Sequence, residues 1–188
     1  MITERAKSGF DTLLQSALKS GLSSAGGPCR IERVEALGAK IKQKKIVVLT
    51  VSSYLFRLLA ILYFKDDAAT RAFFANKGGG DGQTVTLDAQ EFLDRVGECG
   101  NMICGALNRD LGRHFPHVGM STPNVIDRDC MRYVDLLGCG LLRHYRIDLP
   151  DGLEMCASLC VSDYGTVDFH QEAVEEAEDQ TVGELEMF

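Results

Sequence analysis

The sequence predicts an α+β fold in which long helices pack on a mostly antiparallel sheet. Residues 3–22 and 86–115 have apolar side chains at helical spacing, and several shorter segments are rich in β-branched residues. The shorter segments are joined by short turns, which favours antiparallel pairing of strands. The chain has 188 residues, of which 45% are hydrophobic, and this suits one compact domain or two halves that share a core.

The first half of the chain predicts one helix followed by three strands. Residues 3–22 form the helix, and "SSAGGP" after it predicts a loop. Residues 29–38 alternate imperfectly, which indicates a strand with a possible bulge. Residues 46–53 are rich in β-branched side chains and predict a second strand. Residues 55–64 are ambiguous in period, and their flanking turns favour a buried strand over a helix.

The second half predicts two helices and a further set of strands. Residues 66–76 open with Asp caps and predict a short helix, and the glycine-rich residues 77–83 predict a flexible loop without the ending of a phosphate-binding loop. A long helix follows, capped by Thr86 or Asp88 and ending near Gly112. Strands are predicted over residues 117–127, 141–149 and 153–162, and the last two form a hairpin through "PDG".

The charge is unevenly distributed along the chain. The net charge is −7, and residues 171–188 hold seven acidic residues and no Lys or Arg. We therefore assign residues 1–165 to a folded domain and residues 166–188 to an acidic tail, which keeps the protein soluble or forms a solvated helix. Docking is a second role open to this tail. The absence of a basic stripe argues against nucleic acid as a partner.

The cysteine and histidine content predicts no metal site. The seven cysteines are odd in number, form no C-x-x-C pair and lack zinc spacing with His. The amino-terminal residues do not have the pattern of an export signal, and no apolar run is long enough to span a bilayer. We therefore expect reduced thiols in a cytoplasmic protein, away from membranes. None of the four histidines forms a recognisable nucleophile motif with Ser or Cys.

The long helix has a polar stripe along one face. Asp94, Glu98, Asn101, Gly105 and Asn108 follow one another at steps of four, three, four and three residues. Solvated polar positions on an amphipathic helix would give the same pattern. Asn, however, is a poor helix former, and here it lies near two glycines with no evident local compensation. Such a departure from local preference indicates a functional position.

The spacing of Asp94, Glu98, Asn101 and Pro123 resembles the signature of the CheC, CheX and FliY chemotaxis phosphatase family. That signature is Asp or Ser, three residues, Glu, two residues, Asn, about twenty-one residues and Pro. The words "GECGNMICGALNRDLG" and "GMSTPNVI" also resemble the family's helix and following strand. The resemblance implies two helix-bearing halves around one sheet. The first helix lacks an E-x-x-N pair, so the chain is similar to CheX members, which have one site and form homodimers through the sheet.

The resemblance also implies a function. In this family the Asn orients water against the aspartyl phosphate of a response-regulator receiver domain, and the Glu anchors on a receiver Lys. Asn101 and Glu98 would then be the catalytic pair, and Asp94, Gly105 and Asn108 would contact the partner. The receiver supplies Mg²⁺, so this chain needs no cofactor of its own. Two alternatives stay open, namely a non-catalytic receiver-binding scaffold and a purely structural dimerisation domain.

Overall fold

The computed structural model describes residues 1–23, 29–37, 43–76 and 87–172. Its elements are, in chain order, α1 (Glu4–Ser23), β1 (Arg30–Val34), β2 (Lys45–Ser52), β3 (Phe56–Phe64), α2 (Ala68–Asn76), α3 (Ala89–Leu111), β4 (Gly119–Met120), β5 (Asn124–Asp127), the 3₁₀ helix η1 (Arg128–Leu137), β6 (Leu141–Asp148), the short 3₁₀ turn η2 (Pro150–Gly152) and β7 (Glu154–Asp163). The predicted α+β fold is confirmed.

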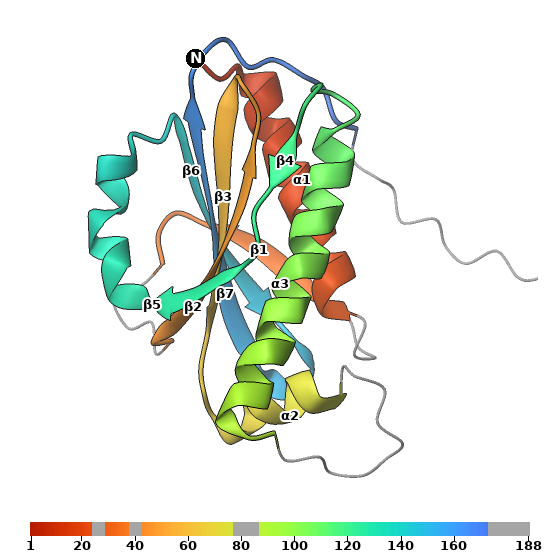
Figure 1. Cartoon of the computed structure of the whole chain (residues 1–188), viewed down its shortest axis with the longest axis vertical. Helices are drawn as coiled ribbons and strands as arrows, with labels where there is room; N and C mark the ends of the chain where they lie inside the picture. The colour runs from red at the N-terminus through yellow and green to blue at the C-terminus, as the bar shows by residue number, and fades with distance from the viewer. Residues whose placement is uncertain (24–28, 38–42, 77–86, 173–188) are drawn as a thin grey trace, which may run out of the picture.

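The strands form one seven-stranded sheet in the order β1-β6-β7-β3-β2-β4, with β5 also paired to β2. Every pair of these strands is antiparallel. Helices α1 and α3 lie on one face of the sheet and η1 lies on the other (Figure 1). We call these the helix face and the far face of the sheet.

The main core lies between the helix face and the helices. Alternate residues of a strand point to opposite faces, so Val47, Leu49 and Leu159 join the core beneath α1 and α3. The strand residues that alternate with these point to the far face, where Ile46, Ile61, Tyr63 and Cys156 form a smaller buried cluster. Met131 of η1 packs against this second cluster. The two faces of the sheet therefore differ greatly in how much apolar surface they bury.

Helices α1 and α3 approach each other closely. A Cβ added at Gly21 of α1 would lie 2.3 Å from Cγ1 of Ile103 in α3, so glycine is required for this spacing. The thiol of Cys99 donates to the carbonyl of Gly21 at 3.5 Å. The apolar face predicted for α3 is buried, as shown by Phe92, Val96, Cys99, Ile103 and Leu107. The orientation of α3 is therefore fixed by its core side and by α1.

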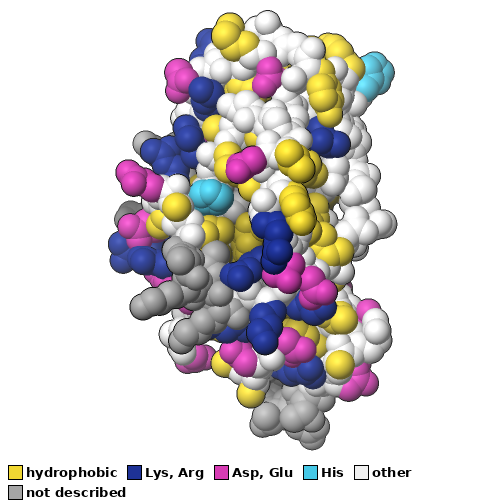
Figure 2. All heavy atoms as spheres, turned by 90° about the vertical axis from the view of Figure 1, so that its left-hand side faces the viewer, with side chains coloured by type: hydrophobic (Ala, Val, Ile, Leu, Met, Phe, Trp, Pro, Cys, Tyr) yellow, Lys and Arg dark blue, Asp and Glu magenta, His cyan; other side chains and the backbone are white. Residues whose placement is uncertain are grey.

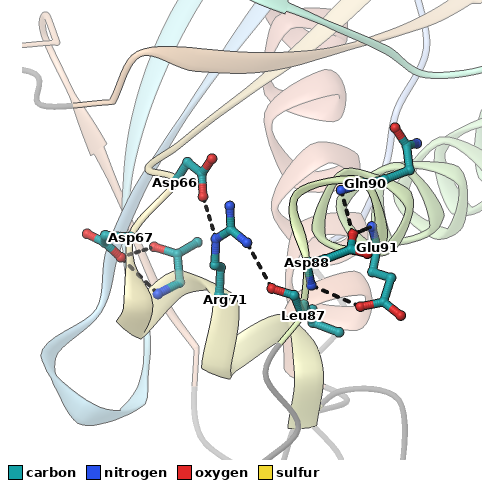
Figure 3. Close-up of polar contacts among 8 residues, drawn as sticks. Asp66, Asp67, Arg71, Leu87, Asp88, Gln90 and Glu91 are labelled. Atoms are coloured by element: carbon teal, nitrogen blue, oxygen red, sulfur yellow. Dashed lines mark hydrogen bonds and ion pairs between the residues drawn. The ribbon is translucent and has the colours of Figure 1, made fainter.

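The start of α3 is fixed by a capping box. Asp88 accepts hydrogen bonds from the backbone N–H groups of Gln90 and Glu91, and the Glu91 carboxylate accepts from the Asp88 N–H at 2.9 Å. Arg71 of α2 donates to the carbonyl of Leu87 at 2.8 Å and pairs with Asp66, so it joins the start of α3 to α2 (Figure 3). Of the two caps expected from the sequence, the structure therefore uses Asp88.

The strands and loops predicted in the second half of the chain are confirmed in part. The strand predicted over 117–127 is interrupted, and its two parts β4 and β5 flank Pro123, which lacks the N–H that a ladder needs. Helix η1 was not predicted. The glycine-rich loop 77–83 lies outside the described residues. The strands predicted over 141–149 and 153–162 form the expected hairpin.

The expectation that all cysteines are reduced is wrong for two of them. The Sγ atoms of Cys139 and Cys160 are bonded, and their Cα atoms are 5.8 Å apart, inside the usual range for a disulfide. This pair could not be predicted from the sequence, because the two residues are 21 positions apart and only the position of β7 in the sheet brings them together.

Residues after β7 pack against the helix layer. The N–H of Thr3 donates to the carbonyl of Val167 at 3.1 Å, and Val167 and Phe169 are buried. The ring of Phe169 makes edge contacts with Phe10 and Phe115, at centroid distances of 5.0 and 5.2 Å. This segment therefore covers part of α1. Within the described ranges, no helix is long and apolar enough to cross a membrane.

Candidate functional site

The predicted polar stripe lies on the outer surface of α3. Asp94, Glu98 and Asn101 are exposed, whereas Gly105 and Asn108 are half-buried. The side chain of Glu98 is 66% exposed. The structure therefore brings all five predicted residues together on one face of one rigid helix, and it presents the carboxylate and the carboxamide of the central pair to solvent.

Close packing beneath the polar stripe determines the distance between α3 and the sheet. A Cβ added at Gly100 would lie 3.0 Å from Leu49, 3.1 Å from Val47 and 3.3 Å from Cβ of Pro123. Gly100 therefore lets α3 lie directly on β2 and on the segment between β4 and β5. Asn101 is the next residue. The residue that touches the sheet most closely is therefore followed directly by the residue whose carboxamide is exposed. Pro123 lies beside this point, and this explains how a residue so far along the chain belongs to the same constellation.

The surface around the pair is open. A Cβ added at Gly97 or at Gly105 would meet no atom within 4 Å. These glycines flank Glu98 and Asn101 along the helix and leave room for another molecule to approach the backbone. Met102 is 48% exposed beside Asn101, and Met120 on the adjoining strand β4 is 49% exposed. Methionine side chains adapt to varied partner surfaces, and the sequence analysis had not singled them out.

The carboxylates of the stripe have local partners. Arg95 lies 3.5 Å from the Glu98 carboxylate, an exposed ion pair of the kind that stabilises little. Asp94 accepts a hydrogen bond from the Gln90 amide at 2.8 Å. Asp94 is therefore turned towards the start of the helix, and in this structure it does not support Glu98.

The two carboxamides of the stripe differ. Asn101 is exposed, and no other described residue hydrogen-bonds to its side chain. Its N–H₂ donors and its oxygen are free to bind water. The Oδ1 atom of Asn108 is buried and has no hydrogen-bond partner within the described part of the chain. Asn108 therefore lies at the edge of the stripe and is less accessible than Asn101.

Neither metal ligation nor thiol chemistry is supported at this site. Among the described residues, no group of three or more His, Cys, Asp or Glu side chains could hold a metal ion. Burial raises the pKa of Cys104, and its thiol lies 3.6 Å from the Thr50 carbonyl. A protonated, buried thiol is a poor nucleophile. Cys104 is therefore part of the packing between α3 and β2.

A second polar cluster, which the sequence analysis missed, lies on the far face. Ser158 is buried, and its hydroxyl lies 2.8 Å from Nδ1 of His144 and 3.0 Å from the Tyr63 hydroxyl. Burial lowers the pKa of His144 and raises that of Tyr63. The three residues come from β6, β7 and β3, so only their strand pairing brings them together. Since Ser158 has no exposed surface, the cluster satisfies polar groups and offers no accessible nucleophile.

No protein-family model matches the sequence, and the search of curated proteins also gave no match. Solved structures do match. Chemotaxis protein CheX from Vibrio vulnificus is 15% identical, with a TM-score of 0.60 over 81% of this chain and 99% of that one. CheX from Desulfovibrio desulfuricans is 16% identical, with a TM-score of 0.57 over 81% and 99%.

A third similar structure is a complex. It contains CheX and CheY of Borrelia burgdorferi with BeF₃ and Mg²⁺, and the matching chain is 16% identical, with a TM-score of 0.55 over 82% of this chain and 97% of that one. These similarities extend over nearly the whole of each matched protein. The chain therefore has the fold of the CheX and CheC-like chemotaxis proteins.

Proposed function

We propose that this protein is a phosphatase that removes the aspartyl phosphate from the receiver domain of a response regulator. The observation that carries the proposal is the exposed pair of Glu98 and Asn101, one turn apart on an uncovered helix face. The Borrelia burgdorferi complex, in which a protein of the same fold is bound to CheY, supports a receiver domain as the partner. The protein would act in the cytoplasm, where response regulators are found.

Asn101 would position the attacking water. Hydrolysis of a phosphoryl group depends mainly on positioning and on charge neutralisation. A carboxamide can hold water through both its donors and its acceptor, and it adds no negative charge beside the phosphoryl oxygens. The open space at Gly105 and Gly97 lets the helix approach another protein. The bound Mg²⁺ would belong to the receiver and would neutralise charge on the phosphate.

Glu98 would anchor the partner through an ion pair with a receiver Lys. Its present pair with Arg95 is long and exposed, so exchange for a cation on the partner costs little. Asp94, Gly105 and Asn108 would form the rest of the contact, with Met102 as an apolar neighbour. We further propose a homodimer, on the resemblance to CheX proteins alone.

The test is the rate at which a purified receiver loses its phosphate. A receiver phosphorylated with a small phosphodonor should lose phosphate faster when this protein is present. Asn101→Ala should abolish the acceleration, with a loss of at least about 100-fold in rate and little change in receiver affinity. Asn108→Ala removes the second carboxamide of the stripe. Because Asn108 is placed in the receiver contact and not beside the attacking water, this variant should leave the rate at saturating receiver unchanged.

Two outcomes separate the alternatives. Binding that favours the phosphorylated receiver but leaves its lifetime unchanged would identify a non-catalytic scaffold, because fold alone does not fix activity. A dimer interface that covers Glu98 and Asn101 would support a purely structural role. Both residues are exposed in the single chain, so a receiver domain can reach them there.

A further inference from the structure

The bonded cysteines join η1 to one of the central strands of the sheet. Cys139 follows Gly138, the left-handed residue that ends η1. Cys160 lies within β7, opposite Leu142 of β6 on one side and Leu59 of β3 on the other. Leu59 packs against the cluster on the far face, so Cys160 points to the same face as η1. The disulfide therefore attaches the end of η1 to a rigid part of the sheet.

The two cysteines are held close together by contacts other than the bond itself. The hydroxyl of Ser162, two residues after Cys160 in β7, donates to the carbonyl of Leu137 at 3.0 Å. The same hydroxyl lies 4.0 Å from Sγ of Cys139. Reduction would therefore leave the two thiols as neighbours, and the bond could form again without refolding.

Proximity, more than accessibility, directs redox chemistry to this pair, because the more exposed Cys130 is not disulfide-bonded. Cys139 is half-buried on a loop, whereas Cys160 is buried behind it. Cys99, Cys104 and Cys156 are buried and are not disulfide-bonded. Burial raises the pKa of Cys156 to about 11, so its thiol stays protonated at neutral pH and reacts slowly.

Besides the disulfide, η1 contacts the sheet region at its two ends and through Met131. The N–H of Arg128 donates to the carbonyl of Lys44 at 3.0 Å, the Leu137 carbonyl accepts from Ser162, and Met131 packs on the far-face cluster. A 3₁₀ helix has three residues per turn, so residues three apart lie on one side. Met131 and Val134 are half-buried towards the sheet, and no residue of η1 is fully buried. On another side, Tyr133 and Leu136 are 60% and 83% exposed. Figure 2 shows this face, where hydrophobic side chains reach the surface between charged groups.

We propose that Cys139 and Cys160 are a reversible redox site that fixes η1 over the cluster of Ile46, Ile61, Tyr63 and Cys156. In the oxidised protein Met131 of η1 packs on this cluster. In the reduced protein η1 opens more often and exposes the cluster. This site lies on the far face and does not depend on the proposed phosphatase activity.

The chemistry is a thiol–disulfide exchange with a low-molecular-weight disulfide such as oxidised glutathione. The Cys139 thiolate attacks one sulfur of the oxidant and releases one glutathione thiolate, leaving a mixed disulfide. The Cys160 thiolate then attacks the Cys139 sulfur and releases the second glutathione. Two protein thiols are oxidised and one glutathione disulfide is reduced to two thiols. Excess dithiothreitol reduces the protein bond again and is itself oxidised to a cyclic disulfide.

Cys156 provides a built-in reporter for the opening of η1. The full chain is prepared with oxidised glutathione or with dithiothreitol, the reagents are removed, and N-ethylmaleimide labelling of each cysteine is followed by peptide mass spectrometry. Cys156 should react at least about tenfold faster in the reduced protein, because the bond restricts opening of the segment that it closes. Cys104, in the helix layer, should react at the same rate in both states.

Two variants sharpen the test. Cys139→Ser should label rapidly at Cys156 under both conditions, because it cannot form the bond. Cys130→Ser, a matched change at an exposed cysteine of η1, should respond to redox state as the wild type does. The proposal fails if oxidised glutathione produces no bond between Cys139 and Cys160. It also fails if the bond forms but Cys156 is labelled at the same rate in the oxidised and the reduced protein. This comparison uses the wild-type protein alone.

Discussion

Helices α1 and α3 lie side by side on the same face of the sheet (Figure 1), but the segment after β7 covers part of α1, whereas Glu98 and Asn101 of α3 are exposed. In α1, a Cβ added at Gly9 would lie 2.6 Å from the ring of Phe169, because the segment after β7 crosses this helix. In α3, a Cβ added at Gly105 would meet nothing within 4 Å. The two helices therefore differ mainly in what covers them.

This difference distinguishes α1 from the helix that carries the candidate site. In α1, Asp11 is used within the protein, because it accepts a hydrogen bond from the buried Tyr145 and pairs with Arg33 at 3.1 Å. The polar groups of α3 point to solvent, and Glu98 and Asn101 are available to a partner. A single candidate site per chain therefore follows from the packing, as well as from the lack of an E-x-x-N pair in α1.

The largest expected effect is the loss of the cover on α1. Phe169→Ala should lower the free energy of unfolding by about 3 kcal/mol, because it removes a buried ring that contacts Phe10 and Phe115. Urea denaturation measures this change, and His170→Ala, at an exposed neighbour, is the control. Receiver dephosphorylation by the folded variant should be unchanged, since α3 is uncovered in both proteins. A loss below about 1 kcal/mol would show that this segment does not contribute to the core.

A pair of glycine substitutions tests the two sides of α3. Gly100→Ala should destabilise the protein by about 1–2 kcal/mol, because the new methyl group presses on Leu49 and Val47. Gly105→Ala should raise stability by up to about 1 kcal/mol, because Ala favours the helix and meets no neighbour. Thermal and urea unfolding of both variants measure these effects. Gly105→Ala should also weaken receiver binding, and equal stability of the two variants would contradict the close approach at Gly100.

The role of Glu98 as an anchor predicts a smaller, salt-dependent effect. Glu98→Ala should weaken receiver binding by about tenfold and reduce its dependence on ionic strength. Glu98→Gln should fall between wild type and Glu98→Ala, because the amide keeps the shape and loses the charge. Titration of receiver in the dephosphorylation assay separates affinity from rate. Arg95→Ala is the control for the intramolecular pair, and equal losses of rate and affinity in Glu98→Ala and Asn101→Ala would refute the division of roles.

The sequence predicted α3 closely because several local signals agree there. Apolar spacing, the Asp88 cap, the terminal Gly112 and the polar stripe all specify the same helix, and the structure places it at Ala89–Leu111. The exposure of Glu98 and Asn101 followed from the same periodicity. The proximity of Pro123 to Gly100 did not follow from periodicity, since only the packing of α3 on β2 brings them together.

The far face was less predictable, for physical reasons. Helix η1 has a repeat of three residues and buries no side chain fully, so it lacks the apolar period that identifies an α-helix. The Cys139–Cys160 bond and the hydrogen bonds of Ser158 depend on strand pairing between residues far apart in the chain. The cover on α1 by Phe169 escaped prediction because this residue adjoins a strongly acidic segment, whose composition suggested solvent.

The smallest expected effect concerns the carboxyl end of α3. Hydrogen bonding from the Arg109 guanidinium, at 2.9 and 3.0 Å, holds the pKa of Asp110 below its ordinary value. A carboxyl whose pKa is lower in the folded state stabilises the protein above the ordinary Asp pKa of about 3.9, and this contribution disappears as pH falls through the folded-state pKa. Because Arg109 is largely exposed, solvent screening limits the effect to less than about 1 kcal/mol.

Asp110→Asn should therefore lower the free energy of unfolding slightly at pH 7, and the difference from wild type should shrink as pH falls below about 4. Urea denaturation across this range measures it, with Asp135→Asn, at an exposed position of η1, as the control. The difference should also fall at high salt, because the pair is near the surface. A difference that stayed constant between pH 7 and pH 3 would mean that Asp110 acts through packing and not through its charge.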